Sequence, residues 1–208
     1  MRVKNQTVYN AILRSATAEF VEHGYVKSTI GKIARRAGTS SSNIYVYFQS
    51  KLDIALAVYE PWFKAQILQL ARSVLKENTP EEKVGRLLEG LWNEIPKHRN
   101  GLTTTLLQAL STATPEDNYN PELLQWTEIE IAELLSESVT GSDQGSQEFK
   151  AVAHMIMLAF DGVGLRHNLN KPIDHRVDMI QRMTAMVCAM PVDAIAQPDS
   201  VVLKMGEG

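Results

Sequence analysis

The sequence predicts an all-α protein, and three observations lead to that prediction. Apolar residues recur at intervals of three and four along almost every segment, which is the period of a helix rather than a strand. Runs of alternating β-branched residues, the usual sign of strands, do not occur in the 208 residues. Serine, threonine or glycine stands where the helical segments should begin or end. We therefore expect a small N-terminal three-helix domain, joined by a long helix to a larger helical domain.

The first three helices are predicted from their apolar faces and from the residues that bound them. The apolar face of the first helix consists of Tyr9, Ile12, Leu13, Ala16 and Phe20. Gly24 is placed to end this helix in a left-handed cap. Thr29 can cap a short second helix, which Gly38 closes, and Ser40 can cap a short third helix.

The remaining helices follow from the same periodicity. Ser50 can cap a long fourth helix, and further helices are expected at residues 80–95, 102–113, 121–139, 147–169 and 174–190. The last stretch has prolines and glycines but no clear period, so we expect a loosely packed tail. We therefore predict a domain at residues 1–51, a second domain at 52–190 and a tail at 191–208.

Pro61 lies well inside the expected fourth helix. Its ring and its missing N–H should bend the helix at this point. The bend can serve as a hinge between the two domains, or it can be a static kink that fits the fold.

Charge is distributed unevenly along the chain. Residues 1–51 contain eight Lys and Arg but only Glu19 and Glu22, a formal charge of +6, whereas the rest carries −9 and the total is −3. A basic N-terminal quarter joined to an acidic remainder indicates that the N-terminal end of the protein binds a polyanion.

Composition and motifs exclude several classes of protein. No stretch approaches the roughly 20 apolar residues that a membrane-spanning helix needs, and the opening MRVKNQTVYN lacks the apolar core of a secretory signal. We therefore expect a cytoplasmic protein. Cys188 is the only cysteine, which excludes intramolecular disulfides and multi-cysteine zinc sites. Motifs of serine hydrolases, nucleotide-binding loops and zinc proteases are absent, so we expect no enzyme, catalytic residue, metal or cofactor.

The segment at residues 29–48 meets the physical requirements of a helix-turn-helix motif. Small Ala34 stands where two short helices must cross closely, Gly38 stands at the turn, and Ile44 can pack back on the first helix. The second of these helices then exposes short polar and aromatic side chains without a carboxylate: Ser41, Ser42, Asn43, Tyr45 and Tyr47. Such a face can enter the major groove of DNA, where asparagine can read adenine and tyrosine can touch a thymine methyl or a phosphate.

This segment also resembles the TetR family of transcriptional regulators, through the run TIGKIARRAGTSSSNIYVYFQSKLDI at residues 29–54. The family pattern is a Thr-led helix with Ile-Ala, a Gly-x-Ser turn, and an aliphatic-Tyr-x-Tyr-Phe-x-Ser-Lys stretch. The resemblance covers about residues 8–56. Gly31 and Lys32 depart from the pattern, and Gly31 removes a side chain that could contact a base.

The resemblance implies roles for individual residues and for the whole chain. It implies that Thr29, Tyr47 and Lys51 hold DNA phosphates, while Ser41, Ser42, Asn43 and Tyr45 face bases. It further implies a repressor that binds palindromic operator DNA as a homodimer and is released by a small-molecule inducer. The alternative is a DNA-bound structural or corepressor-type regulator that has no small-molecule ligand.

Candidate ligand-pocket residues are large aromatics on separate helices of the second domain and one polar pair: Trp62, Phe63, Trp92, Trp126, His154 and Asp161. Aromatic side chains from several helices can wall a cavity or fill a core. His154 and Asp161 are seven residues apart on one helical face, so they can clamp a polar ligand or form a satisfied core pair.

A methionine strip on the last helix is the candidate dimer interface: Met179, Met183, Met186 and Met190. The same helix has a second apolar-leaning face. A helix that is apolar on two faces must be covered twice, so we expect one face to pack on its own domain and the other on a partner chain. The resemblance implies a four-helix bundle made from the last two helices of each subunit.

Overall fold

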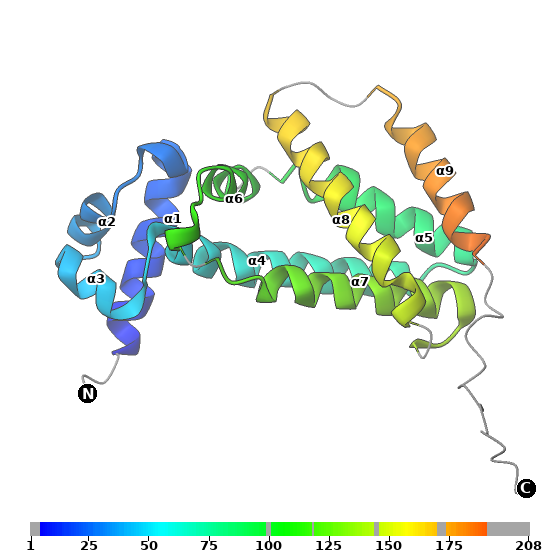
Figure 1. The fold of residues 1–208 in the computed structure, drawn as a ribbon, viewed down its shortest axis with the longest axis horizontal. Helices are drawn as coiled ribbons and strands as arrows, with labels where there is room; N and C mark the ends of the chain where they lie inside the picture. Colours follow the sequence, from blue (N-terminus) through cyan, green and yellow to red (C-terminus); the bar gives the residue numbers. More distant parts are fainter. Residues whose placement is uncertain (1–4, 99–100, 118, 144–145, 170–173, 191–208) are drawn as a thin grey trace, which may run out of the picture.

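The computed structural model describes residues 5–98, 101–117, 119–143, 146–169 and 174–190. The expected tail at 191–208 lies outside the described residues. Regular structure in the described ranges is entirely helical, as predicted, with elements α1 (Gln6–Lys27), α2 (Ile30–Arg36), α3 (Ser41–Tyr47), α4 (Lys51–Val74), α5 (Pro80–Glu89), the π-helical turn η1 (Gly90–Glu94), α6 (Leu102–Ser111), the 3₁₀ turn η2 (Pro115–Asp117), α7 (Glu122–Thr140), α8 (Ser146–Asn168) and α9 (Arg176–Cys188) (Figure 1).

Local signals set the starts of the early helices. Thr29, Ser40 and Ser50 cap α2, α3 and α4, and each side chain accepts a hydrogen bond from the backbone N–H three residues on, at 3.1 to 3.2 Å. Gly38 turns the chain after α2 with a φ of 67°. Gly24, in contrast, does not end α1 as expected. With φ 73° and ψ 166° it forms a kink, after which α1 continues to Lys27.

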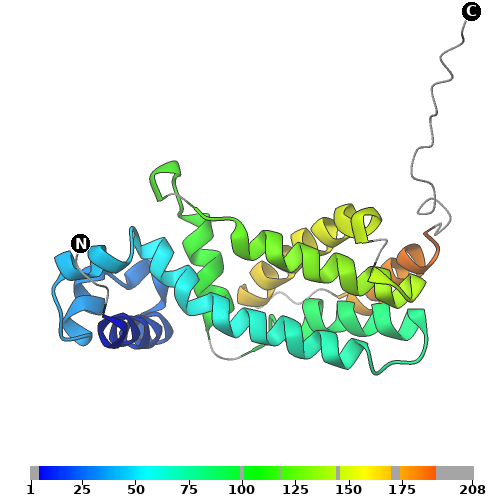
Figure 2. The ribbon, with the colours of Figure 1, turned by 90° about the horizontal axis from the view of Figure 1, so that it is seen from below.

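Two groups of buried apolar residues form the interior. The N-terminal core consists of Ile12, Ala16, Phe20, Tyr25, Ile33, Ala34, Ile44, Phe48, Leu52, Ile54, Ala55 and Ala109. The C-terminal core consists of the other buried apolar residues between Tyr59 and Val187. Helix α4 runs without interruption through Pro61 from the first core into the second (Figure 2).

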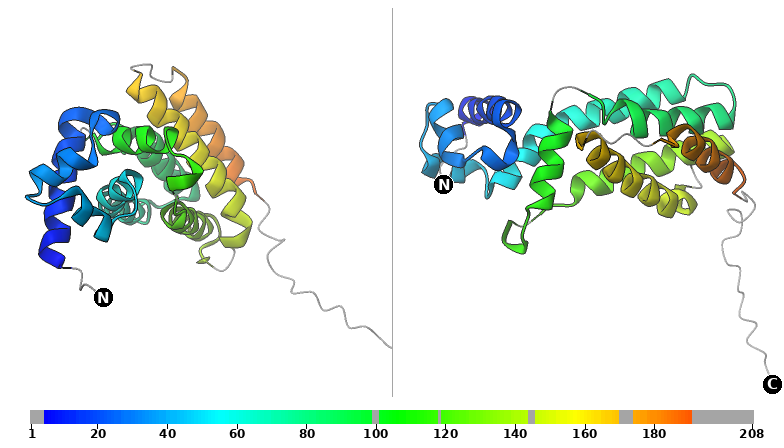
Figure 3. Two further views of the ribbon diagram at one scale, coloured as in Figure 1. Left: turned by 60° about the vertical axis from the view of Figure 1, so that its left-hand side comes forward. Right: turned by 90° about the horizontal axis from the view of Figure 1, so that it is seen from above.

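Helix α6 is the second element that joins the two cores. It contacts α1 and α4 on one side and α8 on the other, and it lies between the N-terminal helices and the body (Figure 1). In the body, α7 packs along α8, and α9 packs against α5 (Figure 3). Every helix of the described ranges is too short or too polar to cross a lipid bilayer.

The π-helical turn η1 follows α5 and begins at Gly90, which lies against Leu70 of α4. Gly90 has no side chain there, and a Cβ atom at this position would overlap the Leu70 side chain of α4. The turn also carries Trp92, whose indole Nε1 donates a hydrogen bond to the Ile156 carbonyl of α8 at 3.1 Å. The absence of a side chain at Gly90 therefore lets η1 bring Trp92 into the C-terminal core.

Gly90→Ala should lower the free energy of unfolding by about 1–3 kcal/mol, because the added methyl overpacks the contact with Leu70. Gly85→Ala on α5 is the matched control, since its nearest neighbour would be the Thr184 hydroxyl at 3.8 Å. This control should be neutral or stabilising by about 0.5–1 kcal/mol. Urea denaturation measures both, and equal stability of the two variants would contradict the close approach at Gly90.

Candidate DNA-binding face and ligand cavity

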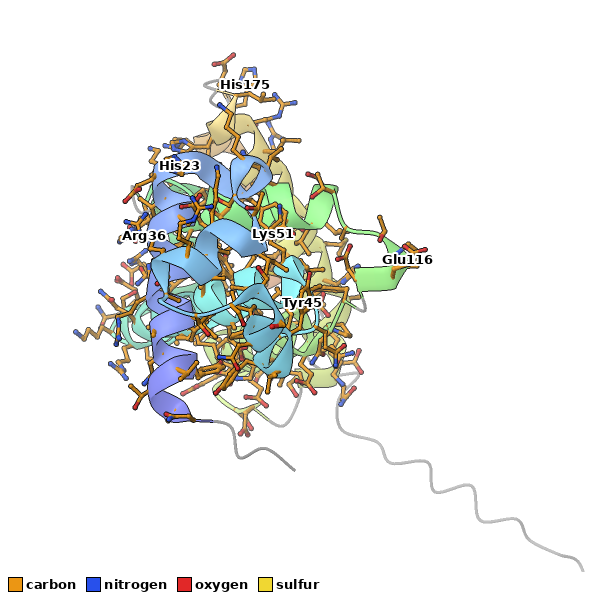
Figure 4. The ribbon with its side chains drawn as sticks, turned by 90° about the vertical axis from the view of Figure 1, so that its left-hand side faces the viewer. His23, Arg36, Tyr45, Lys51, Glu116 and His175 are labelled. Atoms are coloured by element: carbon orange, nitrogen blue, oxygen red, sulfur yellow. The ribbon has the colours of Figure 1, made fainter. Side chains whose placement is uncertain are left out.

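Helix α3 presents the polar face that the sequence predicts. Ile44 is fully buried in the N-terminal core and anchors the helix. Ser41, Ser42 and Tyr45 are exposed on the opposite side, with Tyr45 exposing 57% of its surface. Figure 4, viewed toward the N-terminal domain, shows Tyr45 pointing outward from this face. An exposed helix on a rigid three-helix support is the arrangement that a major-groove reader needs.

Other residues of the face already have partners within the chain. The Asn43 side-chain amide donates to the Thr39 hydroxyl at 2.7 Å. The Tyr47 hydroxyl accepts a hydrogen bond from the Asn5 backbone N–H at 3.1 Å. The hydroxyl of Ser42 pairs with that of Ser40, and the hydroxyl of Thr29 caps α2. These bonds hold the side chains in fixed orientations on α3 and α2.

Lys51 ties the start of α4 to the end of α1. Its ammonium donates to the carbonyls of Tyr25 at 3.0 Å and Ser28 at 3.1 Å, and it lies 4.0 Å from the centre of the Tyr25 ring. Partial burial lowers the pKa of Lys51, and burial raises the pKa of Tyr25 to about 12. Lys51 therefore positions the helix-turn-helix motif on α4, whatever further contact it makes.

An ion-pair network that sequence reasoning missed braces α1 against α2. Arg36 makes two hydrogen bonds to the Glu22 carboxylate, at 2.9 and 2.6 Å, which raise the pKa of Arg36 and lower that of Glu22. Glu19 lies beneath, only 4% exposed, 3.8 Å from both Arg36 and Lys32. The pattern of Glu19 and Glu22 on the same helix face was the only sequence signal of this network.

The body contains a small apolar cavity of about 70 Å³ between α4, α6, α7 and α8. Its lining consists of Leu56, Tyr59, Phe63, Leu106, Leu110, Tyr119, Leu123, Leu124, Thr127, Met157, Phe160 and Asp161. An apolar lining with a few polar groups is typical of small-molecule sites, but a drug-sized ligand would have to widen this cavity on binding.

Two polar groups of the cavity are unusual. The Tyr59 hydroxyl is buried and has no hydrogen-bond partner among the described residues, and burial raises its pKa well above the ordinary value. Asp161 lies at the edge of the cavity, and partial desolvation raises the pKa of its carboxyl. A buried hydroxyl without a partner can be satisfied by a bound molecule.

Among the aromatic residues predicted for a pocket, the structure places only Phe63 in the cavity lining. Trp92 is buried in the C-terminal core, where α8 accepts its indole hydrogen bond. Trp62 packs edge-on against the Tyr59 ring, and Trp126 lies under the Lys64 ammonium at 5.0 Å. These three tryptophans therefore lie outside the lining of this cavity, and their role in ligand binding stays a prediction.

The predicted pair of His154 and Asp161 does not form. His154 is exposed, and its Nδ1 lies 2.6 Å from the Glu128 carboxylate of α7. Asp161 instead faces the cavity. Residues seven apart share a helix face only approximately, and the close packing of α7 on α8 gives His154 a nearer partner.

The methionine strip of α9 also differs from the expectation. Met179, Met183 and Met190 pack against the C-terminal core of their own chain, and only Met186 points outward, 68% exposed. Helices α8 and α9 also expose apolar side chains. They are Met155, Leu158 and Leu165 on α8, Leu169 just after it, and Val177 and Met186 on α9. This set is called the α8–α9 apolar surface below.

Comparisons with known proteins agree with this architecture. The family of bacterial regulatory proteins described as the tetR family matches residues 12–58. The fatty acid metabolism regulator protein of Bacillus subtilis is 26% identical over 100 residues, which are 48% of this chain and 52% of that relative. The match thus spans about half the length of that relative.

Solved structures share the fold along most of the chain. The Thermus thermophilus FadR repressor, in complex with lauroyl-CoA, is 18% identical with a TM-score of 0.65, covering 91% of this chain and 98% of that one. The Bacillus subtilis FadR regulator, in complex with stearoyl-CoA, is 20% identical with a TM-score of 0.55, covering 87% and 98%. The Bacillus halodurans fatty acid degradation regulator FadR is 22% identical with a TM-score of 0.56, covering 90% and 97%.

An exposed α3 on a three-helix core, continuous with a helical body, is the arrangement of a helix-turn-helix DNA-binding protein. Residues 12–58 match the tetR family of bacterial regulatory proteins, which are transcriptional regulators rather than enzymes, and the remaining helices share the fold of the solved FadR regulators.

Lys51→Met should lower the free energy of unfolding by about 1–3 kcal/mol, because it removes the ammonium hydrogen bonds to the Tyr25 and Ser28 carbonyls, of which the Tyr25 carbonyl keeps only the Ser28 backbone N–H. Lys27→Met, which removes an exposed ammonium at the end of α1, is the control and should have little effect. Chemical denaturation compares the two. A Lys51 variant as stable as the control would mean that the two hydrogen bonds have no net effect on folding.

Proposed function

We propose that the protein is a ligand-responsive repressor. It binds palindromic operator DNA as a homodimer, and it leaves the DNA when a small molecule with an apolar chain enters the cavity. One observation carries the proposal: α6 contributes Leu106 and Leu110 to the cavity wall and Ala109 to the N-terminal core. Any ligand that displaces α6 therefore acts on the packing of the DNA-binding domain.

The proposed DNA contacts lie on α3 and its flanks. Ser41, Ser42, Asn43 and Tyr45 would face bases, and Thr29, Tyr47 and Lys51 would hold phosphates. Exposure supports the proposal for the serines and Tyr45, whereas Lys51 would have to release or share its two carbonyl partners. Operator DNA lies in the bacterial cytoplasm, so the proposal places the protein there.

The chemistry of the cavity favours a ligand with a long apolar chain and a neutral polar group. No cationic side chain lines the cavity, and Asp161 stands at its edge, so a free carboxylate inside would be desolvated without a positive partner. The carbonyl of a thioester carries no charge and can accept a hydrogen bond from the Tyr59 hydroxyl. The lauroyl-CoA and stearoyl-CoA complexes of the two FadR relatives support a fatty acyl thioester as the ligand.

A direct contact links α6 to the DNA-binding domain. The Gln108 side-chain carbonyl accepts a hydrogen bond from the Tyr25 backbone N–H at 3.0 Å, next to the kink at Gly24. The Lys51 ammonium also contacts Tyr25 twice: it lies over the Tyr25 ring and donates a hydrogen bond to the Tyr25 carbonyl. A ligand that shifts α6 would thus move the end of α1 and the start of α4 together, and with them the spacing of the two α3 helices in a dimer.

The α8–α9 apolar surface supports a homodimer. Its members Met155, Leu158, Leu165 and Leu169 recur at helical spacing and therefore share one face of α8. Exposed apolar side chains gathered in this way are rare on monomeric proteins and usually mark an interface. A second copy of the chain would cover them through a two-fold axis, in which the same patch meets itself.

The test of the ligand combines thermal shift with fluorescence anisotropy on an operator selected from random-sequence DNA. Lauroyl-CoA should raise the melting temperature and lower operator affinity by about tenfold or more, whereas free dodecanoate should do neither. Leu124→Phe should narrow the cavity and lower lauroyl-CoA affinity by about tenfold without changing operator affinity. Ile129→Phe, exposed on the same helix, is the matched control.

The outcomes separate the competing functions. Operator binding that no acyl-CoA alters would favour the DNA-bound structural or corepressor-type regulator. Failure to select any DNA sequence would refute the repressor altogether.

Leu158→Glu on α8 should convert the dimer to monomer at micromolar concentration, because burying an unpaired carboxylate in the interface costs about 3–5 kcal/mol. Leu68→Glu on the exposed side of α4 is the control and should remain dimeric. Analytical ultracentrifugation reads the result. An intact dimer in the Leu158 variant would place the interface elsewhere.

A further inference from the structure

A second pocket lies on the other flank of α8, away from the apolar cavity. It is a shallow pocket formed by the end of α8, the first residue of α9, and the segment from η1 to Lys97. Its walls combine the apolar Trp92, Pro96 and Val163 with four basic side chains. These are Lys97, Arg166, His167 and Arg176.

The positive charge of this pocket is not neutralised by the chain itself. No carboxylate lines the pocket, and none of its four basic side chains forms an ion pair with any described residue. Two carboxylates in nearby turns are already engaged: Glu94 pairs with Arg86 at 2.9 Å, and Asp178 pairs with Arg182 at 2.8 Å. Cations gathered without a counter-charge repel one another, and a bound anion would relieve that repulsion.

Buried polar atoms at the pocket also lack partners. The Nε of Arg176 is buried and has no hydrogen-bond acceptor among the described residues. The Asn93 side chain donates to the Glu89 carboxylate, but its carbonyl oxygen is buried without a donor. An arginine N–H held inside a pocket without an acceptor is a donor available to a ligand oxygen.

The position of the pocket separates it from the DNA-binding face. Figure 4 shows His175, the residue before Arg176, at the upper edge of the molecule and apart from Tyr45 on α3. The pocket therefore belongs to the helical body.

We propose that this pocket binds the phosphate groups of a small multiply charged anion. Arginine presents two parallel N–H donors to phosphate oxygens, and lysine supplies a point charge, so Arg166, Arg176 and Lys97 suit this chemistry. The phosphates can come from a separate anion, or from the coenzyme A part of the ligand whose chain occupies the cavity. The existence of the site does not depend on the proposed function, because it requires neither DNA release nor an acyl chain.

The experiment measures thermal stability of the full-length protein with pyrophosphate, with free coenzyme A and with lauroyl-CoA, at constant ionic strength. Pyrophosphate and coenzyme A should each raise the melting temperature of the wild type by several degrees. This increase should disappear in Arg176→Gln and become smaller in Lys97→Gln. Because the Lys97 side chain is exposed, its replacement should not disturb folding. Arg182→Gln, exposed on the same helix as Arg176, is the matched control and should keep the full increase.

Lauroyl-CoA distinguishes the two sources of the phosphates. About tenfold weaker binding of lauroyl-CoA to Arg176→Gln supports a single ligand that reaches both pockets, and unchanged binding supports a separate anion. The proposal is overturned if neither pyrophosphate nor coenzyme A stabilises the wild type, or if Arg176→Gln keeps the full increase. It is also overturned if Arg176→Gln loses operator affinity while keeping the increase, since the cluster would then contact DNA.

Discussion

Helix α6 packs against the N-terminal core on one side and lines the cavity of the C-terminal domain on the other. The helix is short, so its residues must serve two neighbours at once: Ala109 is fully buried among the N-terminal helices, while Leu106 and Leu110 face the cavity. Because interiors are close-packed, α6 cannot move toward one core without losing contacts with the other. This shared packing, together with the hydrogen bond from the Tyr25 backbone N–H to Gln108, links the position of α6 to that of α1.

Around this link the DNA-binding domain is held as a rigid unit. The ion pairs of Arg36 with Glu22 and Glu19 join α2 to α1, and the Lys51 ammonium joins α4 to α1. The exposed pair contributes little to stability in water, since solvent screens it, but it fixes geometry. The hydrogen bonds of Lys51 are partly buried and therefore contribute more to folding stability. A displacement at the end of α1 would therefore be transmitted to α3 as a rotation of the whole domain.

The body is less completely satisfied than the DNA-binding domain. The Tyr59 hydroxyl in the cavity and the Arg176 Nε in the basic pocket are both buried without partners among the described residues. Leaving such a group unpaired costs about 1–3 kcal/mol of folding free energy. Both residues line pockets on different sides of α8, where a ligand can supply the missing hydrogen-bond acceptor. This contrast is the one expected when one domain presents a surface and the other accepts a molecule.

The sequence by itself determined the elements whose causes are local. The caps at Thr29, Ser40 and Ser50, the turn at Gly38 and the buried Ile44 depend on residues a few positions away, so the helix-turn-helix motif and the all-α class could be predicted. Tertiary structure alone decided the body. His154 pairs with Glu128 rather than Asp161, Trp92 bonds to Ile156, and the methionines of α9 turn inward, because helices distant in sequence meet there. Periodicity shows which helix face is apolar, but which neighbour covers that face is set by how the helices pack.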